Sequence, residues 1–182
     1  IKSFLLNDEQ LIKKLYSTLG YNSAQVVSKI NVIDERSVDL LFEINRGEKT
    51  KIASVKFIGN NYIRSKRLSD VIASEEDKFW KFLSRNTNFS ESIVSLDKRL
   101  LTNYYKSIGF YNVKVNSSVA EISQSGDAEL TYSIDEGTRY TINKISTNVD
   151  KVFDKDIFFE LNEIYKSYAG QYYSPFKVKK LL

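Results

Sequence analysis

The sequence predicts an α+β fold made of small modules in tandem, and three observations support this prediction. An apolar stripe at helical spacing occurs twice, about ninety residues apart. Each stripe is followed by alternating, strand-like segments, and a glycine closes each element. The repeated stripe residues are Leu11, Ile12, Leu15, Tyr16, Leu19, Gly20 and Tyr21 in the first block and Leu100, Leu101, Tyr104, Tyr105, Ile108, Gly109 and Phe110 in the second.

The strand-like segments repeat at the same spacing. Leu40, Phe42, Ile44 and Gly47 of the first block correspond to Leu130, Tyr132, Ile134 and Gly137 of the second. A third copy opens directly afterwards, because Ile142 and Ile145 echo Ile52 and Val55. Both ends of the chain interrupt this pattern, so we expect the chain to be a fragment of a longer array of modules.

Composition excludes several classes of chemistry. The chain has 182 residues, with no histidine and no cysteine. Serine-histidine and cysteine-histidine catalysis, disulfides and thiolate metal sites are therefore excluded. No apolar run approaches the roughly 20 residues of a membrane helix, and no signal peptide is evident. The net charge of +4 arises from 27 basic residues scattered among 23 acidic ones, which argues against nucleic-acid binding.

The complete module begins with a strand and a short helix. Residues 51–58 alternate, with Val55 and Phe57 expected on one face. Leu68, Val71 and Ile72 then predict a short helix at residues 64–73. The acidic tract Glu75, Glu76 and Asp77 follows, ahead of Trp80 and Phe82.

A longer helix is the clearest element. Ser90 is the expected N-cap, and the apolar stripe from Ile93 to Ile108 predicts a buried face that includes Leu100. Gly109 is expected to end this helix in a left-handed conformation. In the other copies, Asn7 and Gln10 resemble a capping box, and Ser174 followed by Pro175 marks a helix start.

Two strands complete the module. Val113, Val115 and Val119 share one face of residues 113–122, and a turn at residues 125–127 leads to the strand of Leu130, Tyr132 and Ile134. The order is strand, helix, helix, strand, strand, so a three-stranded sheet is expected to pack under two helices.

These features together resemble the polypeptide-transport-associated (POTRA) domain. The resemblance rests on the helix at residues 100–110, the strand close of Ile134, Asp135, Glu136 and Gly137, and the strand opening at residues 55–60. It implies the end of one POTRA module at residues 1–47, a complete module at 51–136 that looks like the third of five in a barrel assembly factor, and the start of another at 140–182. In the last of these, Thr147 and Asn148 stand where the pattern has Gly-Asn.

The resemblance also implies a function. POTRA domains of this kind form the periplasmic region of an outer-membrane protein, whose carboxyl-terminal barrel makes the membrane contact. They receive unfolded outer-membrane protein precursors and dock accessory assembly lipoproteins, and they are neither enzymes nor cofactor or metal binders. Alternative uses of the domain are two-partner secretion, translocation and cell division. A nucleic-acid-binding α/β domain remains a third hypothesis.

Family members place the last strand in the centre of the sheet, which leaves the first strand of the hairpin open to an extended peptide. The implied peptide-binding edge residues are Val113, Lys114, Val115, Asn116, Ser117, Ser118, Val119 and Ala120. The polar side chains here could equally discourage pairing at an idle edge.

The other candidate sites favour structural interpretations. The pairs Tyr104–Tyr105 and Trp80–Phe82 are expected to pack in the core rather than stack on bases. The acidic tract is expected to be a solvated charge run rather than a metal site. The short joints at residues 46–50 and 138–139 predict that the modules move relative to one another.

Overall fold

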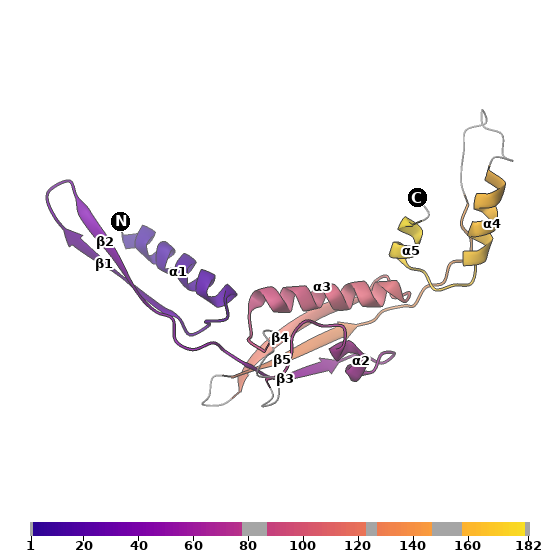
Figure 1. Cartoon of the computed structure of the whole chain (residues 1–182), viewed down its shortest axis with the longest axis horizontal. Helices are drawn as coiled ribbons and strands as arrows, with labels where there is room; N and C mark the ends of the chain where they lie inside the picture. The colour runs from indigo at the N-terminus through magenta and orange to yellow at the C-terminus, as the bar shows by residue number, and fades with distance from the viewer. Residues whose placement is uncertain (1, 78–86, 123–126, 147–157, 181–182) are drawn as a thin grey trace.

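The computed structural model describes residues 2–77, 87–122, 127–146 and 158–180. Its elements form three groups along an elongated molecule (Figure 1). The first group holds α1 (Lys2–Thr18), β1 (Gln25–Val32) and β2 (Val38–Asn45). The central group holds β3 (Ile52–Ile58), α2 (Ser65–Ser69), α3 (Glu91–Ser107), β4 (Lys114–Ile122) and β5 (Asp127–Asp135), and the last group holds α4 (Phe159–Tyr168) and α5 (Pro175–Lys179).

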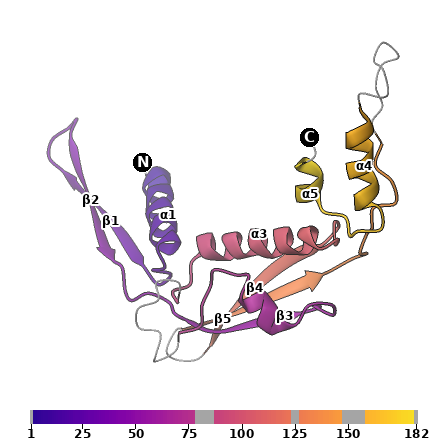
Figure 2. The same ribbon diagram turned by 45° about the vertical axis from the view of Figure 1, so that its right-hand side comes forward.

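The central group is a helix-on-sheet unit. Its sheet has the order β3-β5-β4, with β5 parallel to β3 and antiparallel to β4. The helix α3 lies along this sheet in both views (Figures 1 and 2). The predicted α+β fold, with a three-stranded mixed sheet under two helices and its last strand in the centre, is therefore confirmed.

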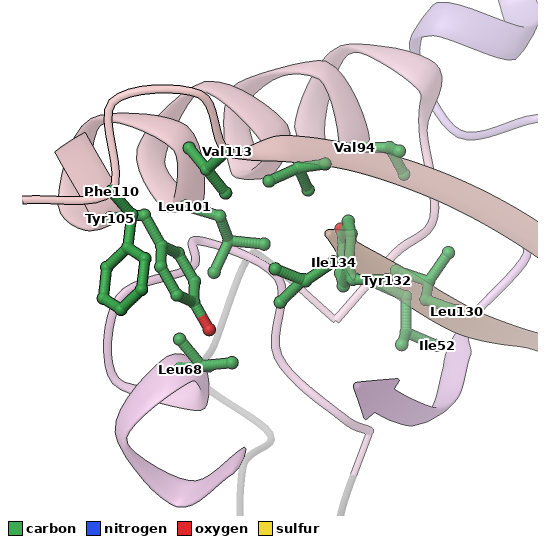
Figure 3. Close-up of a cluster of buried hydrophobic side chains, with 11 residues drawn as sticks. Ile52, Leu68, Val94, Leu101, Tyr105, Phe110, Val113, Leu130, Tyr132 and Ile134 are labelled. Carbon is green, nitrogen blue, oxygen red and sulfur yellow. The ribbon is translucent and has the colours of Figure 1, made fainter. Parts of the chain in front are cut away.

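The core lies between the sheet and the helices (Figure 3). In β5, Leu130, Tyr132 and Ile134 are buried while the residues between them are less covered, as expected for a strand with one core face. They pack with buried side chains from every other element of the group, namely Ile52, Leu68, Val94, Leu101, Tyr105, Phe110, Val113 and Val115.

A β-bulge in β3 allows both Ile52 and Val55, three positions apart, to face the core. Strict alternation would place Ile52 and Val55 on opposite faces. The register against β5 shifts between Ile52 and Ser54, so that Ile52 is fully buried and Val55 also packs against the core.

The long helix α3 begins and ends where the sequence predicts. The Ser90 Oγ accepts a hydrogen bond from the backbone N–H of Ile93 at 3.3 Å, which confirms the N-cap. Gly109 has φ of 108°, which confirms a conformation that other residues avoid. The predicted stripe faces the core, since Leu101 and Tyr105 are fully buried, but Leu100, which was expected on the buried face, is only partly buried.

The helices of the outer groups confirm one predicted start and correct another. Ser174 caps α5 and Pro175 occupies its first turn, as expected. The capping box at Asn7 and Gln10 was wrong, because α1 already begins at Lys2 and passes through both residues. The preceding residues are good helix formers, and one of them, Leu5, is buried, so the helix continues through the polar pair.

Several other predictions differ from the structure or concern residues that it does not describe. Helix α2 is shorter than the expected 64–73, although Leu68 is buried as predicted. No named strand is described around Ile142 and Ile145 within residues 140–146, only the bridge Thr141–Tyr172. The predictions for Trp80, Phe82, the turn residues Ser125 and Gly126, and the pair Thr147 and Asn148 lie outside the described residues.

The joint between the first two groups is a short run of backbone hydrogen bonds. The carbonyl of Gly20 accepts from Thr50 N–H at 3.1 Å, and the carbonyl of Thr50 accepts from Phe89 N–H at 2.8 Å. The second joint repeats this pair: Gly109 accepts from Tyr140 at 2.8 Å, and Tyr140 accepts from Tyr173 at 2.9 Å. The same main-chain geometry thus connects both pairs of groups.

Side chains distinguish the two joints. At the second joint, Arg139 Nε donates to the Ile108 carbonyl at 2.8 Å, and its guanidinium lies 3.3 Å from the centroid of the Tyr172 ring. At the first joint, Lys49 Nζ lies 5.2 Å from the Tyr21 ring, and Asn88 takes the bridge position that Tyr172 holds in the second. Among the described residues, a cation stacks on a ring of the following group at the second joint and not at the first.

Candidate functional site

Strand β4 is an edge of the three-stranded sheet. It pairs with β5 from Lys114 opposite Asp135 to Ile122 opposite Asp127. Of the predicted edge residues, Val113 lies just before the strand, and the other seven lie in it, namely Lys114, Val115, Asn116, Ser117, Ser118, Val119 and Ala120. The structure therefore brings the predicted residues together along one open edge.

The direction of each backbone group on β4 follows from the central strand. The N–H of Ala128 donates to the Lys51 carbonyl at 2.8 Å, so it points toward β3. Because successive residues in a strand point their backbone groups to alternate sides, Glu129, Thr131, Ser133 and Asp135 point toward β4. Their partners on β4 are Ala120, Ser118, Asn116 and Lys114, whose N–H and C=O groups therefore point inward.

It follows that Val115 and Ser117 point their backbone groups outward, away from β5. In the part of the chain that the structure describes, no hydrogen bond reaches these outward groups. Their side chains lie on the core side, since Val115 is buried and Ser117 half-buried, whereas Lys114, Asn116 and Ser118 are exposed on the other face. Val115 and Ser117 thus offer main-chain donors and acceptors at an edge whose core face is already packed.

The opposite edge of the sheet is occupied. On β3, the outward N–H of Val55 donates to Glu76 Oε1 at 3.1 Å. Ile52 donates to the Thr87 carbonyl and accepts from Asp77 N–H, both at 2.7 Å. The acidic tract was expected to be a solvated charge run, and this was wrong for Glu76, whose half-buried carboxylate covers this edge. Asp77 meets β3 only through its backbone N–H, and its exposed carboxylate pairs with Lys51. This contact could not be predicted from the residues around the tract, because it depends on how the tract folds back onto β3.

Two buried carboxylates anchor the loops and the sheet under α3. Asp97 of α3 is fully buried and accepts from Ala73 N–H and from the Tyr132 hydroxyl, both at 2.6 Å. Glu136 accepts from Tyr62 N–H at 3.1 Å and from the Tyr105 hydroxyl at 2.9 Å. Sequence reasoning missed both roles, although an aspartate inside the apolar stripe of α3 is a readable signal.

The tyrosine partners of these carboxylates stay neutral. Burial, followed by the hydrogen bond to Asp97, raises the pKa of Tyr132 far above its ordinary value. Burial and the bond to Glu136 likewise raise the pKa of Tyr105. Each hydroxyl therefore remains a donor to its carboxylate. The prediction that Tyr105 packs in the core is confirmed, while Tyr104 is partly buried with the Arg67 guanidinium 5.5 Å from its ring centroid.

The solvent face of the sheet carries a small charged cluster. Glu129 Oε2 lies 2.7 Å from Lys56 Nζ and accepts from Ser54 Oγ at 3.0 Å. The bonds from Lys56 and then Ser54 lower the pKa of the Glu129 carboxyl. Within residues 2–77, 87–122, 127–146 and 158–180, no group of three acidic, histidine or cysteine side chains could hold a metal ion. None of the helices in these same ranges has the length and apolarity to cross a membrane.

Comparison with known proteins gives one family. Residues 50–137 match the POTRA family, described as a surface antigen variable number repeat. The outer membrane protein assembly factor BamA of Neisseria meningitidis is 22% identical over 140 residues, which cover 76% of this chain and 18% of that protein. BamA of Buchnera aphidicola is 27% identical over 139 residues, covering 75% of this chain and 22% of that protein.

A solved structure shares the fold. The crystal structure of POTRA domains 3–5 of Haemophilus influenzae BamA matches with a TM-score of 0.52 and 21% identity, over 97% of this chain and 66% of that chain. The present chain spans about a fifth of the length of the curated relatives it matches.

Proposed function

Because residues 50–137 of this chain belong to the POTRA family, we propose that the chain is the periplasmic protein-binding region of an outer-membrane β-barrel assembly factor. In this role it receives unfolded outer-membrane protein precursors by adding them as a strand alongside β4. The relatives in Neisseria meningitidis and Buchnera aphidicola are named for outer membrane protein assembly, which supports the proposal. The region acts by binding, with no catalytic step.

The open edge of β4 carries this proposal. The outward backbone groups of Val115 and Ser117 can pair with any extended chain, because main-chain hydrogen bonds do not depend on side-chain identity. An unfolded barrel precursor consists of alternating segments that pair readily as strands. Binding is expected to be weak, because the peptide must be ordered and buries few side chains.

Docking of accessory assembly lipoproteins is the second part of the proposed role, and it follows from the POTRA resemblance. It is tested with a purified lipoprotein of the same assembly machinery on an immobilised full chain. Retention by the chain supports docking, and loss of retention in variants of the exposed surface would locate it.

The experiment for the edge uses Ser117. Replacing Ser117 by proline removes one outward N–H, and it should leave the β4–β5 ladder in place, since that N–H does not bond β5. We expect the dissociation constant of an alternating threonine-valine peptide to rise at least about fivefold, as the loss of one hydrogen bond implies. NMR titration measures it, and the amides of Val115 and Ser117 should shift before those of α3.

The matched control is Ser117→Ala, which keeps the N–H and should bind the peptide like the unmodified chain. A folded Ser117→Pro variant with unchanged affinity would rule out strand addition at this edge. Filter binding at low salt with single-stranded DNA tests the nucleic-acid alternative, and we expect no retention.

A further inference from the structure

A tyrosine-lined groove lies where β4 begins. It has a volume of about 410 Å³ and is lined by Tyr111, Asn112, Tyr140, Thr141 and Tyr173. Tyr111 and Asn112 lead directly into β4, Tyr140 and Thr141 belong to the second joint, and Tyr173 precedes α5. A hollow of this size can take one large side chain. The backbone segments that carry these residues lie between the C-terminal end of α3 and the start of α5 (Figure 2).

The rings of this groove are held in place. The rings of Tyr111 and Tyr173 meet edge to face, with centroids 5.5 Å apart and planes at 76°. The Asn112 side-chain amide donates to the Tyr140 hydroxyl at 3.2 Å. Tyr111 and Tyr140 nevertheless remain 48% and 42% exposed. Exposed but ordered tyrosines lose little conformational freedom on binding, and tyrosine is enriched at binding hot spots.

The charges near the groove decide which side chain it suits. Aromatic hollows accept either a cation or another apolar ring. Lys106 Nζ already lies 5.5 Å from the centroid of the Tyr111 ring. Arg139, next to Tyr140 in the chain, adds a second positive charge at the joint. A basic side chain would be repelled here, so the groove favours an aromatic one.

The groove lies close to the start of the open edge, because two of its lining residues, Tyr111 and Asn112, immediately precede β4. Tyr111 lies three positions before Lys114, the first residue of β4, in the turn that leads into the strand, so the two residues are at most about 10 Å apart along the chain. A peptide that pairs with Val115 and Ser117 therefore reaches the groove with one of its ends. We propose that this groove receives an aromatic side chain near one end of the same extended peptide that adds to β4. This inference rests on the proposed function, and it names the side chain that the edge selects.

The test compares three peptides on the full chain. Each is an alternating threonine-valine decapeptide flanked by glutamates. The first has a single tyrosine near its carboxyl end, the second has it near its amino end, and in the third the tyrosine is replaced by alanine. Because the groove lies at only one end of β4, one of the two tyrosine peptides should bind about tenfold tighter than the alanine peptide, and the other should bind like it. The position of the tyrosine in the tighter-binding peptide shows whether the added strand runs parallel or antiparallel to β4.

Variants of the chain separate the groove from the edge. Tyr111→Ala combined with Tyr173→Ala should remove the tenfold advantage and leave the alanine peptide unaffected, whereas Tyr173→Phe, which keeps the ring, should retain it. Phe159→Ala is the matched control, because this ring is 66% exposed on α4. Circular dichroism confirms that each variant folds.

The outcomes distinguish the two proposals. Equal affinities for all three peptides, or an advantage that survives the double alanine variant, overturn the groove and leave the edge standing. If Ser117→Pro binds all three peptides as tightly as the unmodified chain and still prefers one tyrosine peptide, strand addition at β4 is ruled out and only the aromatic groove remains. No binding of any peptide overturns both.

Discussion

At the scale of single residues, Asp97 and Glu136 show why the centre of the molecule tolerates charge. Each carboxylate is buried, and each accepts both a loop N–H and a tyrosine hydroxyl. A buried carboxylate without partners would be costly, so these bonds tie the loops after β3 and α2 to the core. The module is therefore fixed by two polar contacts inside an apolar cluster.

Removing one of these donors should be costly. In Tyr132→Phe, Asp97 stays buried but loses the hydroxyl at 2.6 Å. We expect the free energy of unfolding to fall by about 1.5–3 kcal/mol, as for a hydrogen bond to a charged group. Chemical denaturation measures it, with Tyr62→Phe as the control, since Tyr62 is 67% exposed. Equal losses in the two variants would contradict the role assigned to Asp97.

The register of α3 gives a second residue-scale prediction. Leu101 is fully buried in the core, and Leu100 is only partly buried. Leu101→Ala should therefore lower the free energy of unfolding by about 2–5 kcal/mol, and Leu100→Ala by about 1 kcal/mol. If denaturation ranked the two variants in the opposite order, the helix would be rotated relative to this description.

At the scale of elements, the sequence predicts whatever depends on local periodicity. The cap at Ser90, the stop at Gly109 and the buried face of β5 each have a signal within a few residues. The burial of Leu100 was overestimated, because Leu100 and Leu101 are adjacent and both apolar and only Leu101 is fully buried. The cover that Glu76 gives to β3 depends on a partner far along the chain.

The features of the candidate site also divide into those that the sequence predicted and those that it did not. Its eight residues and its edge position were predicted, but the direction of each amide was not, since it depends on which residues of β5 already bond β3. The groove at Tyr111 was also missed, because three separate segments build it.

Proline scanning of β4 tests these amide directions. Asn116 N–H points toward β5, opposite Ser133, so Asn116→Pro removes a ladder bond and should lower the free energy of unfolding by at least about 2 kcal/mol. Ser117→Pro should cost less than about 1 kcal/mol, because its N–H has no partner among the residues that the structure describes. Thermal and chemical denaturation compare the two. A more damaging proline at Ser117 would reverse the assignment of the open groups.

At the scale of the whole molecule, the joints govern how the groups can move. Both joints share the same backbone hydrogen bonds, but only the second adds the Arg139 guanidinium stacked on Tyr172. The sequence predicted motion between modules from the shortness of the joints alone. From the difference in side chains we expect more of that motion at the first joint.

Distance measurements between spin labels test this asymmetry, and the absence of cysteine from the chain makes introduced cysteines unique. Labels at Asn31 and Ser95 span the first joint, and labels at Ser95 and Asn162 span the second. We expect the broader distance distribution across the first joint. Tyr172→Ala should broaden the second distribution, whereas Phe159→Ala should not. Equal widths in the unmodified chain would mean that the guanidinium contact does not restrain the joint.

The repeated joint also bears on how such a chain can change in length over evolution. Both junctions use main-chain donors and acceptors at equivalent positions, beginning at Gly20 and at Gly109. An in-frame recombination between these two glycines would excise one module and bring the Gly20 carbonyl to the Tyr140 N–H, the donor that the Gly109 carbonyl now meets. Because the bonds involve only backbone groups, the new junction would need no compensating substitution to form. Modules joined in this way can be gained, lost or exchanged as units.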